Sequence, residues 1–412
     1  MSKIPSIAMI PSAYKSGKVY SVLPSDGSAD LNFARASEAT RVNQNGLIEK
    51  VGSNVPRIDY TDGGCPKLLL EPQSRNLITH SEDFSDASWL RINGGLGSVP
   101  VVTANQGLSP DGSANADRVV FDLGGGTSSS DSSILANSIT LGGVNQNTRS
   151  VYIKSNTGSN YNMVLGTNSP TVDNSIVEIV VTTEWQRFDL THTPTTTTTN
   201  FYFGLRNAFG ITGLSDTADI LIWGAQLEEQ SYATSYIPTN GGTVTRNAET
   251  ASKANISNLI NSSEGVLYAE IKPLTNSNYG GIYLSDNTTS NRLFLVGTST
   301  ENEIALGGNG ITTLRHVELG LNDKYSKIAL VYKVNSVSLW VNGVEVGTNN
   351  TFYTGNTLTT LSLNDLDLNP VFKGKTKALK VYNQALTDLE LEEMTGFKSF
   401  VQMANQLNYT VI

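Results

Sequence analysis

Cysteine, charge and long apolar runs are all scarce in this 412-residue sequence. Its one cysteine, Cys65, excludes an intrachain disulfide and says nothing about the redox compartment. Charged residues make up only 16% of the chain, the formal net charge is −9, and no cluster of Lys and Arg stands out. Binding to nucleic acid through its phosphate backbone is therefore not expected.

Apolar runs are short from the first residues onward. In MSKIPSIAMIPSAYKSGK, Pro5 and Pro11 interrupt the stretch where a signal peptide has its continuous apolar core. No later run approaches the ~20 apolar residues of a membrane-spanning helix. We therefore expect a protein made in the cytosol, without Sec-type export and without a membrane partner.

Residues that favour turns and strands are abundant. Glycine occurs 37 times, and Thr, Ser and Asn crowd the stretches between short alternating segments. Short strands with polar turns fit this mixture better than helices do, and the length predicts two or three domains. The expected fold class is all-β, with two antiparallel β-sandwiches of the jelly-roll type preceded by an extended N-terminal region.

Four segments between residues 76 and 238 alternate with the two-residue period of a half-buried strand. In RSVYIKS, EWQRFDLTHT and NFYFGLRN, one row is apolar and the opposite row carries rings and cations. In ADILIWGAQLE, the predicted buried row is Leu221, Trp223, Ala225 and Leu227. Buried rows on successive strands predict a sandwich over residues 76–238.

A stretch with Pro and Gly at 239–254 predicts a linker, and a second β-rich block follows at 255–412. Asn342-Gly343 predicts a type I′ hairpin turn. A two-residue loop there pairs Val341 with Val344 and Leu339 with Val346.

One short helix is expected near the end of this block, within KALKVYNQALTDLELEEM. Thr387 and Glu390 form the pattern of a capping box. We expect the helix to act as a lid over the open end of the sandwich, with a buried stripe made of Leu386, Leu389, Met394 and Phe397.

Residues 1–75 differ from both blocks. Short extended pieces are separated by Gly, Pro and Asn, and Arg35, Arg41 and Arg57 recur among them. No run is long enough for a core of its own, so the segment should pack on a neighbour or on another chain. We interpret it as an attachment region.

Two stretches of the last block resemble a known family. KIALVYKVNSVSLWVNGVEVG and GKTKALKVYNQALTDLELEEM are similar to the late strands of the laminin-G-like, concanavalin A-like jelly roll. The resemblance covers about residues 255–400. It implies a fold that mostly binds glycans or proteins and that includes some glycosidases.

Segments between residues 33 and 250 resemble accessory virion proteins of tailed bacteriophages. FARASEATRVNQNGLIEKV, PRIDYTDGGCPKLLLEPQSRNLITHSEDFSDASW, IWGAQLEEQSYATSYIPT and TVTRNAET are similar to segments of tail-fibre, head-fibre and decoration proteins. The resemblance implies a carbohydrate-binding-like jelly roll at 76–238, a place in the virion and contact with the host surface. It also implies other virion proteins as partners of region 1–75, and a homo-oligomer.

No residue pattern predicts catalysis. A glycosidase needs two carboxylates about 5 to 10 Å apart across a cleft. The DLELEE cluster lies on the predicted helix, where a solvated face is the simpler interpretation. Asp365 and Asp367 lack the flanking glutamates of the jelly-roll glucanase strand. A polysaccharide depolymerase is therefore the less favoured alternative.

No residue spacing predicts a specific metal site either. His80, His192 and His316 are scattered and lack the spacing of a zinc site. Ca²⁺ could bind Asp and Asn side chains in the loops, although no stretch has a specific ligand spacing. No other cofactor is expected.

Glycan binding is the predicted activity, because sugar C–H faces stack on rings and sugar hydroxyls bond to amides and charged groups. The candidate glycan-binding residues are Tyr152, Trp185, Tyr202 and Arg206 in the middle block, with Tyr283 and Trp340 in the last. Two alternatives stay open. The rings could instead cover the outer face of the sandwich or contact the next domain, and the protein could be a structural capsid decoration protein that binds no sugar.

Overall fold

The computed structural model describes residues 3–397 and 399, with gaps at 12, 168–174, 208–210, 212, 276, 289, 309–310, 351–352, 354, 356 and 365–371. The described part of the chain is all-β with one short helix, and the chain divides into two compact units. Unit 1 comprises Met1–Gly46, Val51–Gln73 and Asn247–Ile412, and unit 2 comprises Leu47–Lys50 and Ser74–Arg246.

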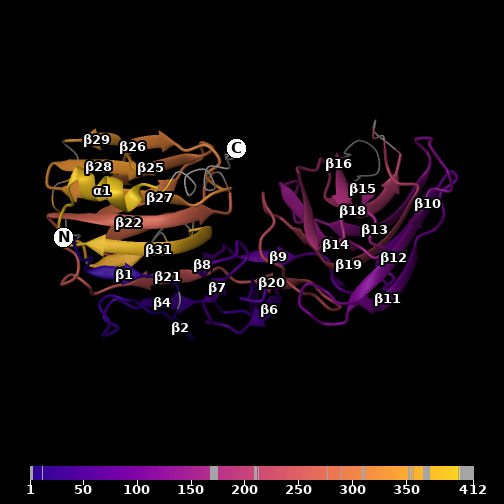
Figure 1. Cartoon of the computed structure of the whole chain (residues 1–412), viewed down its shortest axis with the longest axis horizontal. Coiled ribbons are helices and arrows are strands. Elements are labelled where there is room, and N and C mark those ends of the chain that lie inside the picture. Colours follow the sequence, from indigo (N-terminus) through magenta and orange to yellow (C-terminus); the bar gives the residue numbers. More distant parts are fainter. Residues whose placement is uncertain are drawn as a thin grey trace. The chain divides into compact units, whose positions relative to one another are not determined.

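Unit 1 is a β-sandwich of two antiparallel sheets (Figure 1). One sheet, here called the helix-bearing sheet, has the order β29-β28-β27-β22-β31-β8-β7, and β1 also pairs with β31. Its strands are β1 (Ile7–Met9), β7 (Arg57–Asp59), β8 (Lys67–Leu70), β22 (Glu264–Pro273), β27 (Ser326–Lys333), β28 (Ser336–Val341), β29 (Val344–Asn349) and β31 (Gly374–Tyr382).

The second sheet of unit 1 has the order β2-β3-β4-β21-β30-β23-β24-β25-β26. Its strands are β2 (Tyr14–Lys15), β3 (Lys18–Val19), β4 (Leu31–Ala34), β21 (Thr250–Lys253), β23 (Gly281–Ser285), β24 (Arg292–Gly297), β25 (Glu303–Gly308), β26 (Ile311–Val317) and β30 (Thr360–Ser362). The short strands β5 (Ala39–Val42) and β6 (Ile48–Val51) follow β4 in the chain.

The N-terminal segment adds strands to the same sandwich as the C-terminal block. Strand β1 pairs with β31, and Leu68–Leu70 also pair with β31. Strand β4 pairs with β21, which lies in the range expected to be a linker. The expected ranges 1–75, 239–254 and 255–412 therefore do not correspond to separate structural units, because these short strands have their apolar rows in one shared core.

The hairpin at Asn342-Gly343 has the predicted turn. The φ angles of Asn342 and Gly343 are 51° and 92°, as a type I′ turn requires. Val341 pairs with Val344 as predicted, but a register shift pairs Leu339 with Gly347 instead of Val346.

The predicted helix forms as α1 (Asp388–Thr395), with Thr387 and Glu390 making the capping box. Its orientation differs from the expected one. Leu389 is 66% exposed, whereas Leu391 is 1% exposed. The helix contacts β27 and β28 and packs on the outer face of the helix-bearing sheet, so it does not close an open end of the sandwich (Figure 1).

Unit 2 is a second antiparallel sandwich with the sheet orders β10-β13-β18-β15-β16 and β11-β12-β19-β14-β17, plus the pair β9-β20. Its strands are β9 (Ser74–Asn76), β10 (Trp89–Gly94), β11 (Val101–Gly107), β12 (Ala116–Asp122), β13 (Ser132–Thr140), β14 (Asn147–Ser155), β15 (Tyr161–Thr167), β16 (Ser175–Val181), β17 (Gln186–His192), β18 (Thr198–Arg206), β19 (Thr217–Glu228) and β20 (Val244–Arg246).

Most apolar rows of unit 2 are buried as predicted, including those of RSVYIKS and NFYFGLRN. The prediction for ADILIWGAQLE is half wrong. Ala225 and Leu227 face the core as predicted. In the first half of the strand, however, Ile220 and Ile222 face the core in place of Leu221 and Trp223. Gly224 has φ +66°, and the register with β14 shifts at this point. A bulge therefore changes the phase of the strand and places Leu221 and Trp223 on the outer face.

Within the described part of the chain, helix α1 has neither the length nor the apolar character to cross a bilayer.

Candidate functional site

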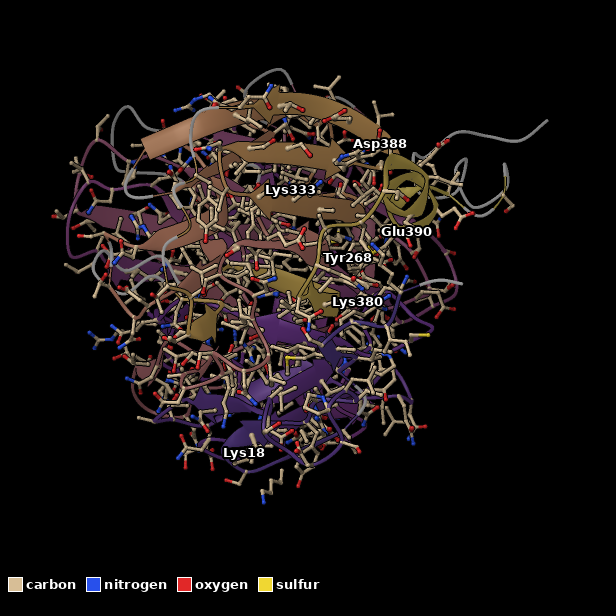
Figure 2. The ribbon with its side chains drawn as sticks, turned by 90° about the vertical axis from the view of Figure 1, so that its left-hand side faces the viewer. Lys18, Tyr268, Lys333, Lys380, Asp388 and Glu390 are labelled. Atoms are coloured by element: carbon tan, nitrogen blue, oxygen red, sulfur yellow. The ribbon has the colours of Figure 1, made fainter. Side chains whose placement is uncertain are left out.

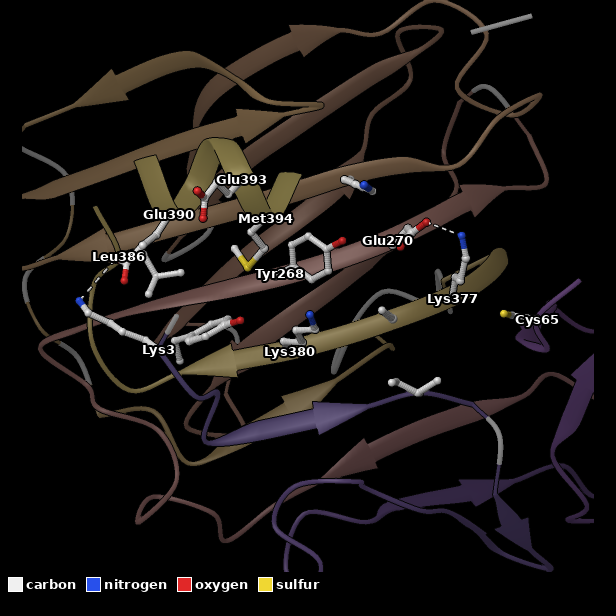
Figure 3. A pocket seen from close by; sticks show the side chains of 14 residues that line it. Lys3, Cys65, Tyr268, Glu270, Lys377, Lys380, Leu386, Glu390, Glu393 and Met394 are labelled. Atoms are coloured by element: carbon white, nitrogen blue, oxygen red, sulfur yellow. Dashed lines mark hydrogen bonds and ion pairs between the residues drawn. The ribbon is translucent and has the colours of Figure 1, made fainter. Parts of the chain in front are cut away.

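A groove of about 440 Å³ lies on the outer face of the helix-bearing sheet of unit 1, beside α1 (Figures 2 and 3). Its volume is in the range of small-molecule sites. The lining residues come from the N-terminal segment, from β22, β27 and β31, and from the turn and helix that follow β31: Lys3, Ile10, Cys65, Tyr268, Glu270, Lys327, Lys377, Ala378, Lys380, Tyr382, Leu386, Glu390, Glu393 and Met394.

Helix α1 forms one wall of this groove because an apolar cluster holds it on the sheet. Leu386 and Leu391 pack with Tyr268, Tyr382 and Trp340 from the outer face of the strands. The capping box at Thr387 fixes where the helix begins. The outer row of the sheet is therefore apolar under the helix and polar beside it.

The middle of the groove is made by Tyr268 and Lys380, which are register partners on β22 and β31. The Lys380 ammonium lies 5.2 Å from the centre of the Tyr268 ring, within the range of a cation–π contact. Burial raises the pKa of Tyr268, so its hydroxyl stays protonated and can donate a hydrogen bond at neutral pH. Figure 3 shows both side chains between the helix and β1.

The two ends of the groove are closed by ion pairs (Figure 3). At one end, Lys377 Nζ lies 2.8 Å from a carboxylate oxygen of Glu270. At the other, Lys3 Nζ lies 3.7 Å from Glu390 and donates a 2.8 Å hydrogen bond to the carbonyl of Ala385. Hydrogen bonds from Thr387 and the charge of Lys3 lower the pKa of Glu390. These pairs position charged groups around an apolar and aromatic floor.

This mixture of groups can hold a polyhydroxyl ligand. Ammonium groups and the Tyr268 hydroxyl donate hydrogen bonds, carboxylates accept them, and the floor offers apolar contact. A glycosidase acid needs a carboxyl whose pKa is raised. Glu390 has a lowered pKa, so it does not suit that role.

Tyr152, in β14, and Trp185, directly before β17, lie on the outer face of one sheet of unit 2. Tyr152 is the register partner of Arg187, whose guanidinium carbon lies 5.4 Å from its ring centre. Lys154 Nζ lies 5.4 Å from the Trp185 ring, and Trp185 Nε1 donates to the carbonyl of Leu108. Both rings are half-buried. They remain candidates for ligand contact, each with a cation over it.

Tyr202 and Arg206 lie together on the other sheet of unit 2, so the structure does not bring them onto one face with Tyr152 and Trp185. Tyr202 faces outward as expected but is only 1% exposed. Ile134, Ala136 and Val164 pack around its ring. The Tyr202 ring therefore packs on the outer face of the sandwich, as in the first of the two alternatives, and is not exposed to a ligand.

The two candidates in unit 1 are also covered. Tyr283 stacks near Phe294, and the Arg292 guanidinium lies 5.7 Å from its ring. Trp340 is 7% exposed and packs in the cluster beneath α1. Neither ring is available for stacking in this conformation.

A second polar pocket of about 500 Å³ lies in unit 2 and includes Glu82 and Asp117. Burial raises the pKa of both carboxyl groups. Glu82 accepts hydrogen bonds from Tyr236 and Asn115, and Asp117 accepts from the backbone N–H groups of Phe84 and Asn105. These bonds give both carboxylates a structural role in holding the surrounding segments.

Metal ligands do not gather in the described ranges, where no group of three His, Cys, Asp or Glu side chains could hold an ion. His80 lies beside Asp86, and His316 lies beside Glu318. Asp365 and Asp367 lie outside the described residues.

The groove was missed at the sequence level although its residues stand in the segment KALKVYNQALTDLELEEM. Lys380 and Tyr382 alternate with the buried Leu379 and Val381, which marks them as outer-face residues. What the sequence does not indicate is that α1 and the N-terminal segment with Lys3 meet beside them.

Comparison with known proteins gives one family match. Residues 240–392 match the model of the concanavalin A-like lectin/glucanases superfamily, which agrees with the resemblance expected for the last block. The match covers less than half of the chain. No curated protein matches the chain.

Several solved structures are similar in part. Domain 4 of a GH43 extracellular arabinanase from Geobacillus stearothermophilus, in complex with arabinotriose, is 16% identical with a TM-score of 0.30 over 40% of this chain and 83% of that one. The CBM40 of a Ruminococcus gnavus sialidase, bound to α2,3-sialyllactose, is 15% identical with a TM-score of 0.27 over 33% and 83%. A CBM22 tandem from Paenibacillus barcinonensis is 12% identical with a TM-score of 0.27 over 76% and 98%.

Proposed function

We propose that this protein is a non-catalytic glycan-binding protein and that the groove of unit 1 is its binding site. The observation that carries the proposal is the match of residues 240–392 to a superfamily of lectins and glucanases. Both kinds of protein must recognise a saccharide. The groove offers donors, acceptors and an apolar floor, and most of its residues lie within the matched range.

Binding is favoured over cleavage by the partners of the groove carboxylates. Glu270 is engaged by Lys377, and Glu390 is engaged by Lys3 and by the start of α1. The lowered pKa of Glu390 makes this residue a poor general acid, because its charged form is favoured. Incubation with host capsular polysaccharide should release no new reducing ends. Their appearance would restore the depolymerase alternative.

A finer proposal concerns where the protein acts. The segments between 33 and 250 that resemble accessory proteins of tailed bacteriophages support a virion component that attaches to the host surface. Residues 1–75 would bind other virion proteins, and the protein would form a homo-oligomer at a symmetric position. Antibody-labelled electron microscopy of phage particles that carry the protein tests this location. Label at one defined position of the head or tail is expected, and unlabelled particles would contradict it.

A glycan array tests the binding function directly. The wild-type protein should bind at least one glycan, and Lys380→Ala should weaken that binding about tenfold, equal to about 1.4 kcal/mol. Lys333→Ala is the matched control, because Lys333 is exposed on the same unit and does not line the groove (Figure 2). A flat array would favour the structural decoration protein. Loss of binding with Trp185→Ala alone would move the site to the outer face of unit 2.

A further inference from the structure

A pocket of about 470 Å³ lies in unit 2. It lies where the end of β13 meets β9 and the segments after β19. Its lining residues are Arg75, Leu77, Thr79, Ser88, Asn137, Ser138, Ile139, Thr140, Leu141, Gly142, Glu229 and Thr243.

Asn137 is the anomalous residue of this pocket. It stands in the inner row of β13 between Leu135 and Ile139, which both belong to the hydrophobic core. Its register partners Trp89 and Phe201 belong to the same core. Asn137 is 5% exposed, and its Nδ2 has no hydrogen-bond partner among the described residues. An apolar side chain would satisfy the fold better, so the amide calls for a partner that the described residues do not supply.

The amide can serve a ligand in the pocket as donor or acceptor. The terminal torsion of Asn is broad and roughly two-fold, so a half-turn about it exchanges the N–H group and the carbonyl oxygen that face the pocket. A ligand hydroxyl, which both donates and accepts, would suit either orientation.

Charge at the pocket is balanced. Arg75 and Glu229 are both exposed and carry opposite charges. Arg75 Nε donates to Thr243 Oγ1 at 3.0 Å, and Glu229 accepts from the backbone N–H of Gly142 at 2.9 Å. Among the lining residues, no other side chain is charged at neutral pH. The pocket therefore has no excess charge to attract an anion or a cation.

The remaining lining mixes hydroxyl and apolar groups. Thr79 and Ser88 supply hydroxyls, and Leu77 and Leu141 supply apolar surface, whereas Ser138 and Thr140 stand in the outer row of β13. A sugar ring presents hydroxyl edges and C–H faces to match this arrangement. We infer that this pocket is a second saccharide site and that it takes an uncharged sugar residue, with Asn137 bonding a ring hydroxyl. The inference rests on the proposed glycan-binding function but concerns a different unit from the groove.

Saturation-transfer difference NMR on the full chain tests the inference, with glucose, galactose, mannose and N-acetylglucosamine as probes and glucuronic acid as the charged comparison. At least one neutral sugar should give a signal, and glucuronic acid should bind more weakly. Asn137→Leu should abolish the signal and leave the melting temperature unchanged or raised, because it removes an unpartnered buried amide. Thr79→Trp should abolish it by filling the pocket, because Thr79 lines the pocket in the same row as Arg75 and Leu77.

Two controls separate this site from the groove. Arg91→Ala changes an exposed cation on β10 outside the pocket and should leave the signal intact. Lys380→Ala should also leave it intact. Unchanged binding in both pocket variants, or a preference for glucuronic acid, overturns the inference while the proposed function stands. Loss of the signal in Lys380→Ala but not in Thr79→Trp assigns the sugar to the groove and overturns the inference as well. Absence of all saccharide binding by the wild-type protein, in NMR and on the array, overturns both.

Discussion

The two units bury arginine in opposite ways. In unit 1, Arg35 Nη1 lies 2.8 Å from a Glu249 oxygen, and Arg57 bonds both Glu249 and Glu71. Although burial acts against the charged form, these carboxylates raise the pKa of Arg57. In unit 2, Arg149 is equally buried, but it forms no ion pair with any described residue. Burial lowers the pKa of Arg149 to about 10. The buried charges of Arg35 and Arg57 therefore stabilise unit 1, whereas the buried charge of Arg149 lowers the stability of unit 2.

The largest effect is expected at Glu249. Its carboxylate accepts hydrogen bonds from Arg35, from Arg57 and from the backbone N–H of Glu71. Glu249→Gln leaves two buried guanidinium groups without their shared countercharge, so the free energy of unfolding should fall by about 3–5 kcal/mol. Urea unfolding followed by circular dichroism measures the loss. Glu301→Gln, at an exposed position, should change stability by less than about 0.5 kcal/mol. Equal effects of the two variants would contradict the role of Glu249.

Arg149 should respond with the opposite sign. Its Nη2 bonds Asn147 at 2.7 Å and Thr199 at 3.4 Å, while Nε and Nη1 have no hydrogen-bond partner in the described chain. Arg149→Met removes a buried charge and keeps an apolar stem of similar length, so stability should rise by about 1–3 kcal/mol.

The matched variant Arg57→Met sharpens this comparison. It leaves Glu249 and Glu71 short of a cation and should destabilise the protein. The same substitution is thus expected to have opposite effects in the two units. Destabilisation by both variants would mean that Arg149 has a stabilising role that its hydrogen bonds do not account for.

Much of the fold follows from the alternation of single strands, and its exceptions lie where that alternation breaks. Val151 and Ile153 are buried as the pattern predicts, and the hairpin at Asn342-Gly343 has its predicted turn. Trp223 is misplaced by the pattern because a strand is assumed to keep its phase. Gly224 within the strand was the available signal for a bulge.

The candidate sites were less predictable than the fold, because they depend on which elements meet in space. Tyr202 was placed on the correct face, but its cover comes from Ile134 and Val164 on two other strands. Trp340 is buried because α1 packs on an outer face and not at an end. The buried pair of Arg57 and Glu249 joins residues 192 positions apart in the chain, which no local pattern can indicate.

Gly224, at the bulge in β19, differs from Gly158 in how closely its neighbours approach. A Cβ at Gly224 would lie 3.1 Å from Tyr152 Cδ2, and its φ of +66° disfavours other residues. Gly224→Ala should therefore cost about 1–2 kcal/mol and disturb the packing of Tyr152 on Trp223. Thermal unfolding and near-UV circular dichroism report the two effects. Gly158→Ala is the control, because its φ is +85° but the space around it is open. A larger loss in the control would contradict the role of this contact.

The smallest expected effect is the loss of stability at low pH that comes from the ion pairs of Asp62 in unit 1. Asp62 lies 3.1 Å from Lys375 Nζ and 3.3 Å from Lys272 Nζ, and it accepts a 2.7 Å bond from Tyr325. Although burial acts in the other direction, Lys375, Tyr325 and Lys272 lower the pKa of Asp62 to about 2. A lowered folded-state pKa adds stability above the unfolded value near 4, and this stability is lost as pH falls from about 4 to about 2.

Asp62→Asn should therefore reduce stability at pH 6, by no more than about 1 kcal/mol because the carboxylate is partly exposed to solvent. The difference between wild type and variant should shrink as pH falls from about 4 to about 2, because Asp62 becomes increasingly protonated in the folded state over this range. Urea midpoints measured between pH 6 and pH 2 test this convergence. A difference that stays constant over that range would show that the ion pairs of Asp62 do not stabilise unit 1.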